Sequence, residues 1–351
     1  MPEPFLGLSR ADRQETLEVA YQRHLERAPA LLEKDVWVVW CLRALFDAPF
    51  AEHLVFKGGT SLSKAYDVIE RFSEDVDLTY DIRALVEDDQ AGQPQELSRA
   101  RVRSLTAEIR KTLLPRFIDD EVTPHLKNRL SAEGLQATIE RDGDDLLVFY
   151  DAAVEYPAYV QPRVKLEFGG RSTGEPAEPR LVECYLAAAF PEFSFPSATP
   201  RVMNPKRTFW EKATAIHVFC RVGAFRGGAG FARHWYDLTR LDAVGYADQA
   251  MSDRDLAEAV ADHKSKFFAA KGPGGELVDY HLAVHGGLQL VASGEAYDLL
   301  AADYAAMVEA GYLDGDIPSF AVLMTSCQSL QDRVNAATGT PPATETLPTS
   351  G

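Results

Sequence analysis

The chain has 351 residues, 46% of them hydrophobic, so it can bury a substantial core in one large domain or two ordinary ones. Its formal net charge of −17, from 36 Lys and Arg against 53 Asp and Glu, argues against an open basic surface and restricts any polynucleotide contact to a local patch. The four cysteines lack Cys-x-x-Cys spacing, so we expect buried thiols in a cytoplasmic protein. No apolar run is long enough for a membrane span, so membrane insertion is not expected.

Two helices are expected near the N-terminus. Ser9 to Asp12 has the pattern of a helix N-cap and first turn, and an apolar stripe continues from there to Leu25. Residues 30–46 are apolar around most of the helix circumference, which predicts a helix that is packed on several sides.

A glycine pair follows the next apolar run. Residues 54–56 are apolar and end near Gly58 and Gly59, after which apolar residues recur at helical spacing, so the stretch predicts a strand, a tight turn and a helix. Backbone N–H groups at a helix N-terminus lack intrahelical partners and favour anions, so a phosphate fits this turn. Thr60 and Ser61 add hydroxyl donors.

Ser61 and Ser63 are expected to differ. The spacing places Ser61 at the turn and Ser63 inside the helix, so we predict that Ser61 contributes more to triphosphate binding.

Two aspartates follow the predicted helix. Asp75 and Asp77 flank Val76 in an alternating pattern typical of a half-buried strand, so both carboxylates share one face. Adjacent carboxylates repel unless a cation lies between them, and Mg²⁺ prefers such oxygen ligands and also binds nucleotide phosphates. Each half of this pattern alone is more often a plain turn or a solvated strand face. Together they favour a metal-phosphate site.

A later strand over residues 160–168 carries charges on one face. Residues 137–150 precede it as a predicted hairpin with an Asp-Gly turn. Within the strand, Lys165 and Glu167 alternate with apolar residues. From the residues alone, a charge ladder in which Lys165 pairs with Glu167 is the better interpretation.

The ordered set of strand, Gly58-Gly59-Thr60-Ser61, helix and Glu74-Asp75-Val76-Asp77 resembles the nucleotidyltransferase superfamily of the DNA polymerase beta type. The string from Phe56 to Leu78, with Glu33-Lys34-Asp35 upstream, is similar to the AbiEii/AbiGii toxin family. The resemblance implies an α+β fold with a mixed sheet and flanking helices, and a third metal carboxylate on a later strand, for which Glu167 is the candidate. The predicted nucleotide-binding residues are Gly58, Gly59, Thr60, Ser61, Lys64 and Lys165.

The C-terminal part is predicted to be helical. A Pro-rich crossing at 191–205 sets the expected boundary between a core of residues 1–204 and a helical domain of residues 205–335, and residues 336–351 have the composition of a disordered tail. The glycines between 223 and 230 indicate a mobile loop more than a phosphate cradle. His281 and His285 are one helical turn apart without the intervening glutamate of a zinc protease, which favours a packed or surface pair.

Lys212 and Asp237 lie on successive predicted helices that flank the glycine-rich break. Spacing alone favours a surface ion pair between them. The resemblance implies a catalytic lysine and aspartate at these positions, so both are predicted site residues.

The predicted function is a nucleotidyltransferase that uses two Mg²⁺ ions to move a nucleoside monophosphate from a nucleoside triphosphate to an acceptor hydroxyl. The resemblance further implies a bacterial toxin with a cognate antitoxin and with tRNA or another RNA as acceptor. Three alternatives stay open. They are a protein or small-molecule acceptor such as an aminoglycoside, which the acidic charge favours over RNA, a nucleotide-binding module without turnover, and a helical partner-binding scaffold.

Overall fold

The structure is a computed structural model that describes residues 2–22, 27–71, 73, 75–88, 91, 97–156, 160–224, 230–313 and 315–338. The chain divides into two compact units, Met1–Asn204 and Pro205–Gly351. No helix in these described ranges is long and apolar enough to cross a membrane.

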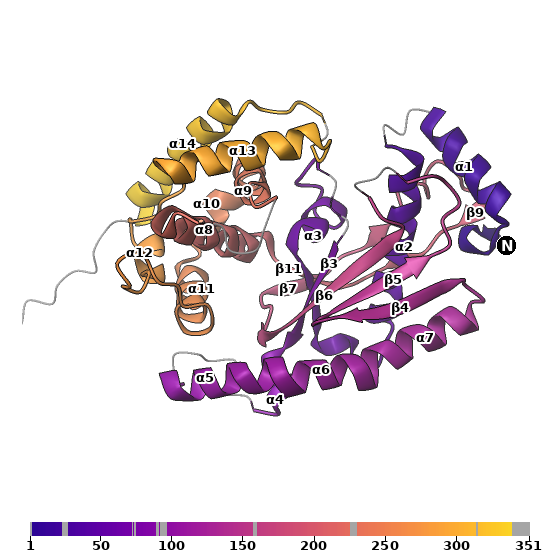
Figure 1. The fold of residues 1–351 in the computed structure, drawn as a ribbon, viewed down its shortest axis with the longest axis horizontal. Coiled ribbons are helices and arrows are strands. Elements are labelled where there is room, and N and C mark those ends of the chain that lie inside the picture. The colour runs from indigo at the N-terminus through magenta and orange to yellow at the C-terminus, as the bar shows by residue number, and fades with distance from the viewer. Residues whose placement is uncertain are drawn as a thin grey trace, which may run out of the picture. The chain divides into compact units, whose positions relative to one another are not determined.

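The first unit contains a seven-stranded mixed sheet in the order β4-β5-β6-β3-β2-β11-β7 (Figure 1). The strands are β2 (Leu54–Lys57), β3 (Asp75–Asp81), β4 (Ala137–Asp142), β5 (Asp145–Tyr150), β6 (Arg163–Ser172), β7 (Ala177–Pro179) and β11 (Arg201–Met203). β3 runs parallel to β6 and β2 parallel to β11, whereas the other neighbours are antiparallel. The predicted α+β class with a mixed sheet is therefore confirmed.

One face of this sheet forms the core of the unit. Val76 and Leu166 face each other in register and are fully buried, as alternation predicts. Trp37 stacks on Tyr150 at a centroid distance of 4.9 Å, so a helix covers this face over β5. Asp75 and Asp77 of β3, and Arg163, Lys165 and Glu167 of β6, have the opposite parity and are only partly buried, so that second face carries charged side chains.

Seven α-helices of the first unit are described. They are α1 (Arg10–Gln22), α2 (Pro29–Phe46), α3 (Gly58–Lys64), α4 (Ile82–Val86), α5 (Arg99–Glu108), α6 (Leu114–Phe117) and α7 (Thr123–Ala132). Two π-helical segments, Ile109–Leu113 and Ile118–Val122, join α5, α6 and α7 into one rod, which is visible in Figure 1. Pro115 falls at the start of α6, where its missing N–H is tolerated.

The Pro-rich crossing is partly a strand. Before it, the short strand β8 (Val182–Glu183) pairs with β10 (Ser197–Ala198) outside the main sheet. β11 lies within the predicted crossing and pairs with β2, next to the predicted turn. Its three residues are too few for a periodicity signal. A second small pair joins β1 (Glu3–Pro4) to β9 (Phe193–Ser194).

The described part of the second unit is helical. It contains α8 (Pro205–Val222), α9 (Arg233–Ala243), α10 (Tyr246–Ser252), α11 (Arg254–Phe267), α12 (Tyr280–Val284), α13 (Glu295–Glu309) and α14 (Phe320–Thr338).

α12 ends at Val284, and the following Gly286 takes a left-handed φ of +84°. The expectation of a tail is wrong for residues 336–338, because α14 continues to Thr338, whose hydroxyl bonds back to the Val334 carbonyl. Residues 225–229 of the glycine-rich loop and 339–351 of the tail lie outside the described residues.

Candidate functional site

The glycine turn lies directly against one of the predicted metal carboxylates. Gly58 has a φ of +79°, and a Cβ placed on it would lie 1.9 Å from Oδ2 of Asp77. Only glycine allows the backbone this close. Lys57, the residue before the turn, is paired in register with Asp77. The turn and the carboxylate therefore form one site, although they come from different strands.

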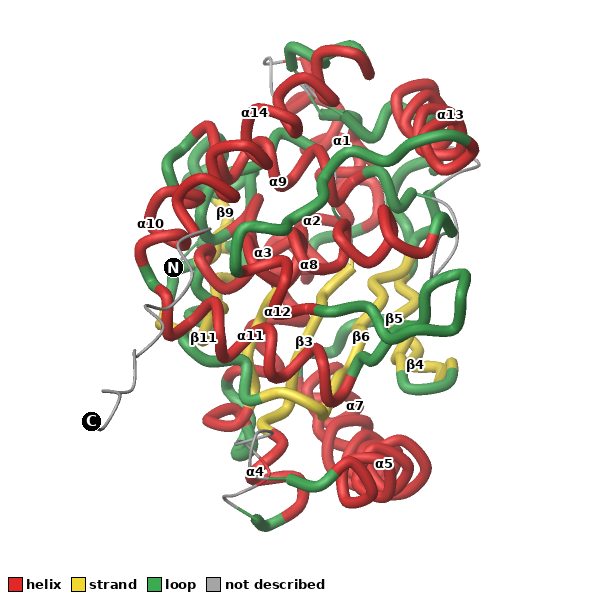
Figure 2. Tube along the Cα trace, turned by 90° about the vertical axis from the view of Figure 1, so that its left-hand side faces the viewer, coloured by secondary structure: helices red, strands yellow, loops and turns green. Residues whose placement is uncertain are grey.

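The acidic side chains of three neighbouring strands lie in one row. Asp77 of β3 is opposite Glu167 of β6, and Glu167 is opposite Asp145 of β5. Asp75 is opposite Lys165, one step along the same face. Figure 2 shows β3, β6 and β5 side by side. The register thus brings Asp75, Asp77 and Glu167 together on the partly exposed face, as the alternation predicted.

Lys165 neutralises part of this row. Its Nζ contacts Oε1 of Glu167 and lies 3.0 Å from Oδ2 of Asp145. Burial alone would lower the pKa of Lys165, but hydrogen bonds to Glu167 and Asp145 raise it above its ordinary value. Burial also raises the pKa of Asp145, and Lys165 partly offsets that shift. The charge-ladder interpretation of Lys165 and Glu167 is therefore present in the structure, so a metal ion at Glu167 would compete with this ammonium group.

The hydroxyl groups of α3 are placed differently from the expectation. The helix begins at Gly58 itself, so Ser61 and Ser63 both lie inside it. Ser61 is fully buried, and its Oγ donates to the Gly58 carbonyl at 2.9 Å. Thr60 is also fully buried and donates to the Asp75 carbonyl at 2.5 Å. The premise that Ser61 lies in an open turn is wrong, because α3 starts without a separate loop.

Lys64 closes a buried contact between two helices. Its Nζ lies 2.6 Å from Oδ1 of Asp35 on α2 and 3.5 Å from the centre of the Tyr185 ring. Oδ2 of Asp35 accepts the Tyr185 backbone N–H at 2.8 Å. Lys64, a predicted nucleotide-binding residue, is thus held by Asp35 in this structure.

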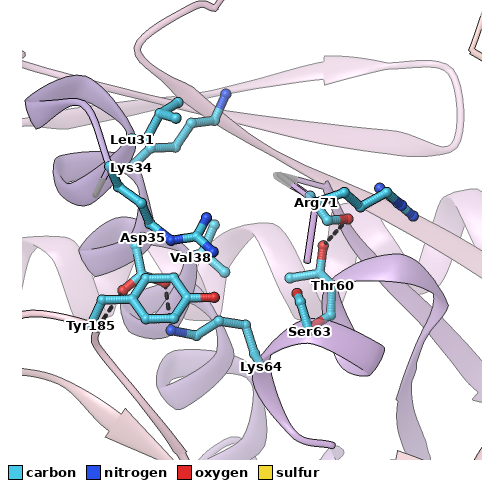
Figure 3. A pocket seen from close by; sticks show the side chains of 11 residues that line it. Leu31, Lys34, Asp35, Val38, Thr60, Ser63, Lys64, Arg71 and Tyr185 are labelled. Carbon is cyan, nitrogen blue, oxygen red and sulfur yellow. Dashed lines mark hydrogen bonds and ion pairs between the residues drawn. The ribbon is translucent and has the colours of Figure 1, made fainter. Parts of the chain in front are cut away.

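A cationic pocket opens beside α3. Its lining includes four basic residues and one acid, Arg27, Lys34, Lys64, Arg71 and Asp35. In Figure 3, Lys64 points towards Asp35 on one wall, while Arg71 lies with Thr60 on the other. This excess of positive charge contrasts with the net −17 of the chain and suits an anion.

The pocket is connected to the glycine turn through two hydrogen bonds and one close contact. Thr60 Oγ1 contacts Ser73 Oγ at 2.8 Å and reaches the carbonyl of Asp75. A Cβ on Gly59 would lie 2.2 Å from an Nη atom of Arg71. An anion in this pocket would therefore lie close to the start of α3 and to the strand that carries the aspartates.

In the helical unit, Lys212 of α8 and Asp237 of α9 form an ion pair. Lys212 Nζ lies 2.8 Å from Asp237 Oδ2, and the side chains are 8% and 0% exposed. Nδ1 of His234 lies 3.5 Å from the same ammonium group. The two residues meet as spacing suggested, but the pair is buried. The expectation of a surface pair is wrong, because the polar side of α8 around Lys212 is covered by α9.

Sequence reasoning missed several of these residues. Neither Arg71, which follows the end of α3 at Lys64, nor Asp145, which begins β5, was among the predicted site residues. A usable signal was available in residues 33–35, because three consecutive charges inside an apolar helix indicate buried, paired groups. All three are less than 9% exposed.

Comparison with known proteins gives the family. A model described as "Nucleotidyl transferase AbiEii toxin, Type IV TA system" matches residues 40–326. No curated protein gives a significant match. Among solved structures, the nucleotidyltransferase toxin MenT4 of Mycobacterium tuberculosis is 18% identical with a TM-score of 0.47, over 96% of this chain and 91% of that chain. Since the family model spans most of the chain, this protein belongs to the AbiEii family of nucleotidyl transferase toxins of type IV toxin–antitoxin systems.

Proposed function

We propose that this protein transfers a nucleoside monophosphate from a nucleoside triphosphate to a hydroxyl group of an RNA, with tRNA as the preferred acceptor. The observation that carries the proposal is the approach of Gly58 to Asp77. It supports the proposal because a phosphate bound at this turn would lie against a carboxylate. A phosphate and a carboxylate repel each other at this distance unless a cation lies between them.

The donor set fits Mg²⁺. Asp75, Asp77 and Glu167 offer carboxylate oxygens from one sheet face, which are the ligands this ion prefers. When bound, two such ions would lower the pKa of the attacking hydroxyl and stabilise the charge on the leaving pyrophosphate. Lys165 would hold Glu167 in place, or release it as the metal binds.

The cationic pocket would hold phosphate groups of the triphosphate. Arg71 packs on Gly59, and Lys34 and Arg27 line the same pocket. Guanidinium and ammonium groups bind phosphate by charge-assisted hydrogen bonds. Thr60, Ser61 and Lys64 are proposed to support this pocket through the buried contacts described above. Fixed positive charge would stabilise the departing pyrophosphate as the bond to the α-phosphorus breaks.

Two further parts of the proposal depend on the family alone. A type IV system implies a cognate antitoxin, which we propose as the protein partner. The family resemblance also supports a catalytic role for Lys212 and Asp237, for which burial offers a purely structural alternative.

Transfer can be tested by incubating the purified chain with each of the four α-labelled nucleoside triphosphates, Mg²⁺, and either total tRNA or a protein extract. We expect label in tRNA with one preferred nucleotide, and loss of labelling in Asp77→Asn. Glu140→Gln is a matched control, because Glu140 lies on β4 at the edge of the same sheet.

The outcomes distinguish the acceptors. Label in protein would keep the chemistry but overturn the RNA acceptor, an outcome that the net charge of −17 would explain. Nucleotide binding without incorporation into either acceptor would instead indicate a binding module. If Asp77→Asn labels the acceptor as fully as the wild type does, the assignment of Asp77 as a metal ligand is wrong.

A further inference from the structure

A cluster outside the candidate active site joins two helices of the second unit. Glu258 of α11 faces His281 of α12 and His285, the residue that caps α12. His285 Nε2 lies 2.6 Å from Glu258 Oε1, and His281 Nδ1 lies 3.3 Å from Glu258 Oε2. One ligand atom from each residue lies within 4.8 Å of the others. The three side chains are 37–44% exposed, so a solvated ion can reach them.

The local folds explain why these residues meet. Positions four apart lie on one face of a helix, which places Glu258 beside Asp262 on α11. Arg254 holds the two helices together by donating to the Val284 carbonyl at 2.6 Å. The sequence alone shows only a histidine pair, because its acidic partners come from a helix more than fifteen residues earlier.

His281 is oriented by a second carboxylate. Its Nε2 lies 3.2 Å from Oδ1 of Asp262, while its Nδ1 faces Glu258. A neutral imidazole has one N–H donor and one lone pair, so it cannot donate to both acids. If Nε2–H donates to Asp262, the Nδ1 lone pair faces a carboxylate, and a cation between them removes that repulsion. Metal-binding histidines commonly have this arrangement, in which the second ring nitrogen donates to a carboxylate.

We propose that Glu258, His281 and His285 form a binding site for a divalent transition-metal ion, with Zn²⁺ as the ion that fits best. Two imidazole nitrogens and one carboxylate are a known zinc ligand set, and water would complete the tetrahedron. Mg²⁺ prefers oxygen ligands and is disfavoured here. The ion fixes α12 to α11 and thereby holds together the two ends of the segment that connects residues 267 and 280. It displaces the Arg254 guanidinium group, which lies 3.7 Å from Oε1 of Glu258, the oxygen that His285 also contacts.

The proposal can be tested by titrating the full-length chain with Zn²⁺ in a calorimeter, with Mg²⁺ in excess to occupy carboxylate-only sites. We expect one Zn²⁺ per chain, and visible Co²⁺ absorption typical of four-coordinate nitrogen and oxygen ligands. His281→Ala and His285→Ala should abolish this binding. Asp262→Asn should weaken it by about 10–100-fold, the usual effect of losing a partner that orients a ligand.

His53→Ala is the matched control. The His53 side chain is 39% exposed and its Nε2 lies 3.7 Å from Oε1 of Glu52, so it pairs one histidine with one carboxylate where the proposed site has two histidines. It should leave zinc binding unchanged. Circular dichroism checks that each variant is folded, and a chelator should lower the melting temperature of the zinc-loaded wild type but not of His281→Ala. Absence of zinc binding, or binding that survives His281→Ala, would overturn the site. Neither result depends on nucleotide transfer, so the proposed function is tested separately.

Discussion

Two lysines in this molecule are paired with carboxylates under opposite conditions of burial. Lys165 in the sheet contacts Glu167 and Asp145, and the three side chains are 30%, 37% and 25% exposed. Lys212 in the helical unit contacts Asp237, and the pair is almost completely buried. Water screens the first cluster, so its members can exchange a partner for a ligand at little cost. The second pair lacks that option, because separation would leave a charge in the protein interior.

Removing one partner of the buried pair should produce the largest effect. Asp237→Ala leaves the Lys212 ammonium buried without its carboxylate, and we expect a loss of about 3–5 kcal/mol in stability of the helical unit. Glu167→Gln, the half-exposed counterpart, should change stability by less than about 1 kcal/mol. Urea denaturation of both variants measures the contrast, and similar losses would show that exposure is not the deciding factor.

The same pair distinguishes a structural role from a catalytic one. Lys212→Met combined with Asp237→Leu removes both charges and should recover most of the stability lost in Asp237→Ala. If the double variant is folded but lacks transferase activity, the pair is catalytic. A folded and fully active double variant would restrict the pair to a structural role.

A second buried group in α8 extends the comparison to pH. His217 is 1% exposed, and burial lowers its pKa from 6.5 to about 4, with Arg221 adding to the shift. The unfolded chain therefore binds a proton that the folded chain excludes between these values, so stability falls as pH drops from about 6.5 towards 4. The difference amounts to roughly 3 kcal/mol. We expect His217→Gln to lack this slope when denaturation is repeated across that pH range.

A methyl group at the glycine turn tests how tightly the exposed cluster is positioned. Gly58→Ala combines a left-handed φ, which costs an L-residue roughly 1–2 kcal/mol, with a contact to Asp77 that must be relieved. We expect activity to fall by at least about tenfold, equivalent to about 1.4 kcal/mol at the transition state. Gly134→Ala has a similar φ of +67° with nothing within 4 Å of the added Cβ. Gly134→Ala should therefore lose stability through its left-handed φ but keep its activity.

The smallest expected effect separates the two serines of α3. Both hydroxyls donate to a backbone carbonyl, Ser61 to Gly58 and Ser63 to Thr60, but of the two serines Ser63 is the one that lines the cationic pocket. Ser63→Ala should therefore weaken triphosphate binding by about 2–10-fold, the effect of one hydrogen bond, and more than Ser61→Ala does. Nucleotide titration of both variants measures the two losses. If the pocket holds the phosphates, Ser63→Ala will show the larger loss, whereas the sequence predicted a larger contribution from Ser61.

Periodicity predicted the fold where an element is long and has one buried face. The alternation around Asp77 and Glu167 predicted that each side chain lies on the charged face, and the register then placed the two opposite each other. The glycine turn was identified because few other sequences permit that backbone. These features depend on residues that are close together in the sequence, so a single sequence is enough to recognise them.

Partners that are distant in the sequence were beyond such reasoning. Asp35 meets Lys64 and Tyr185 only in the folded unit, and β11 is too short to show a pattern. The surface interpretation of Lys212 failed for a related reason. Its exposure is determined by α9, whose packing α8 alone does not reveal.

The position of β11 affects how the toxin is synthesised. β2, which leads into the glycine turn, lies between β3 and β11, and β11 is the last strand of its unit to be translated. Ribosomes add about 5–20 residues per second, so β2 has an unpaired edge for several seconds or longer in a nascent chain. An unpaired edge is prone to aggregation, which makes this interval the vulnerable stage of biosynthesis. It also means that the sheet bearing the candidate site is completed only after Met203 has left the ribosome.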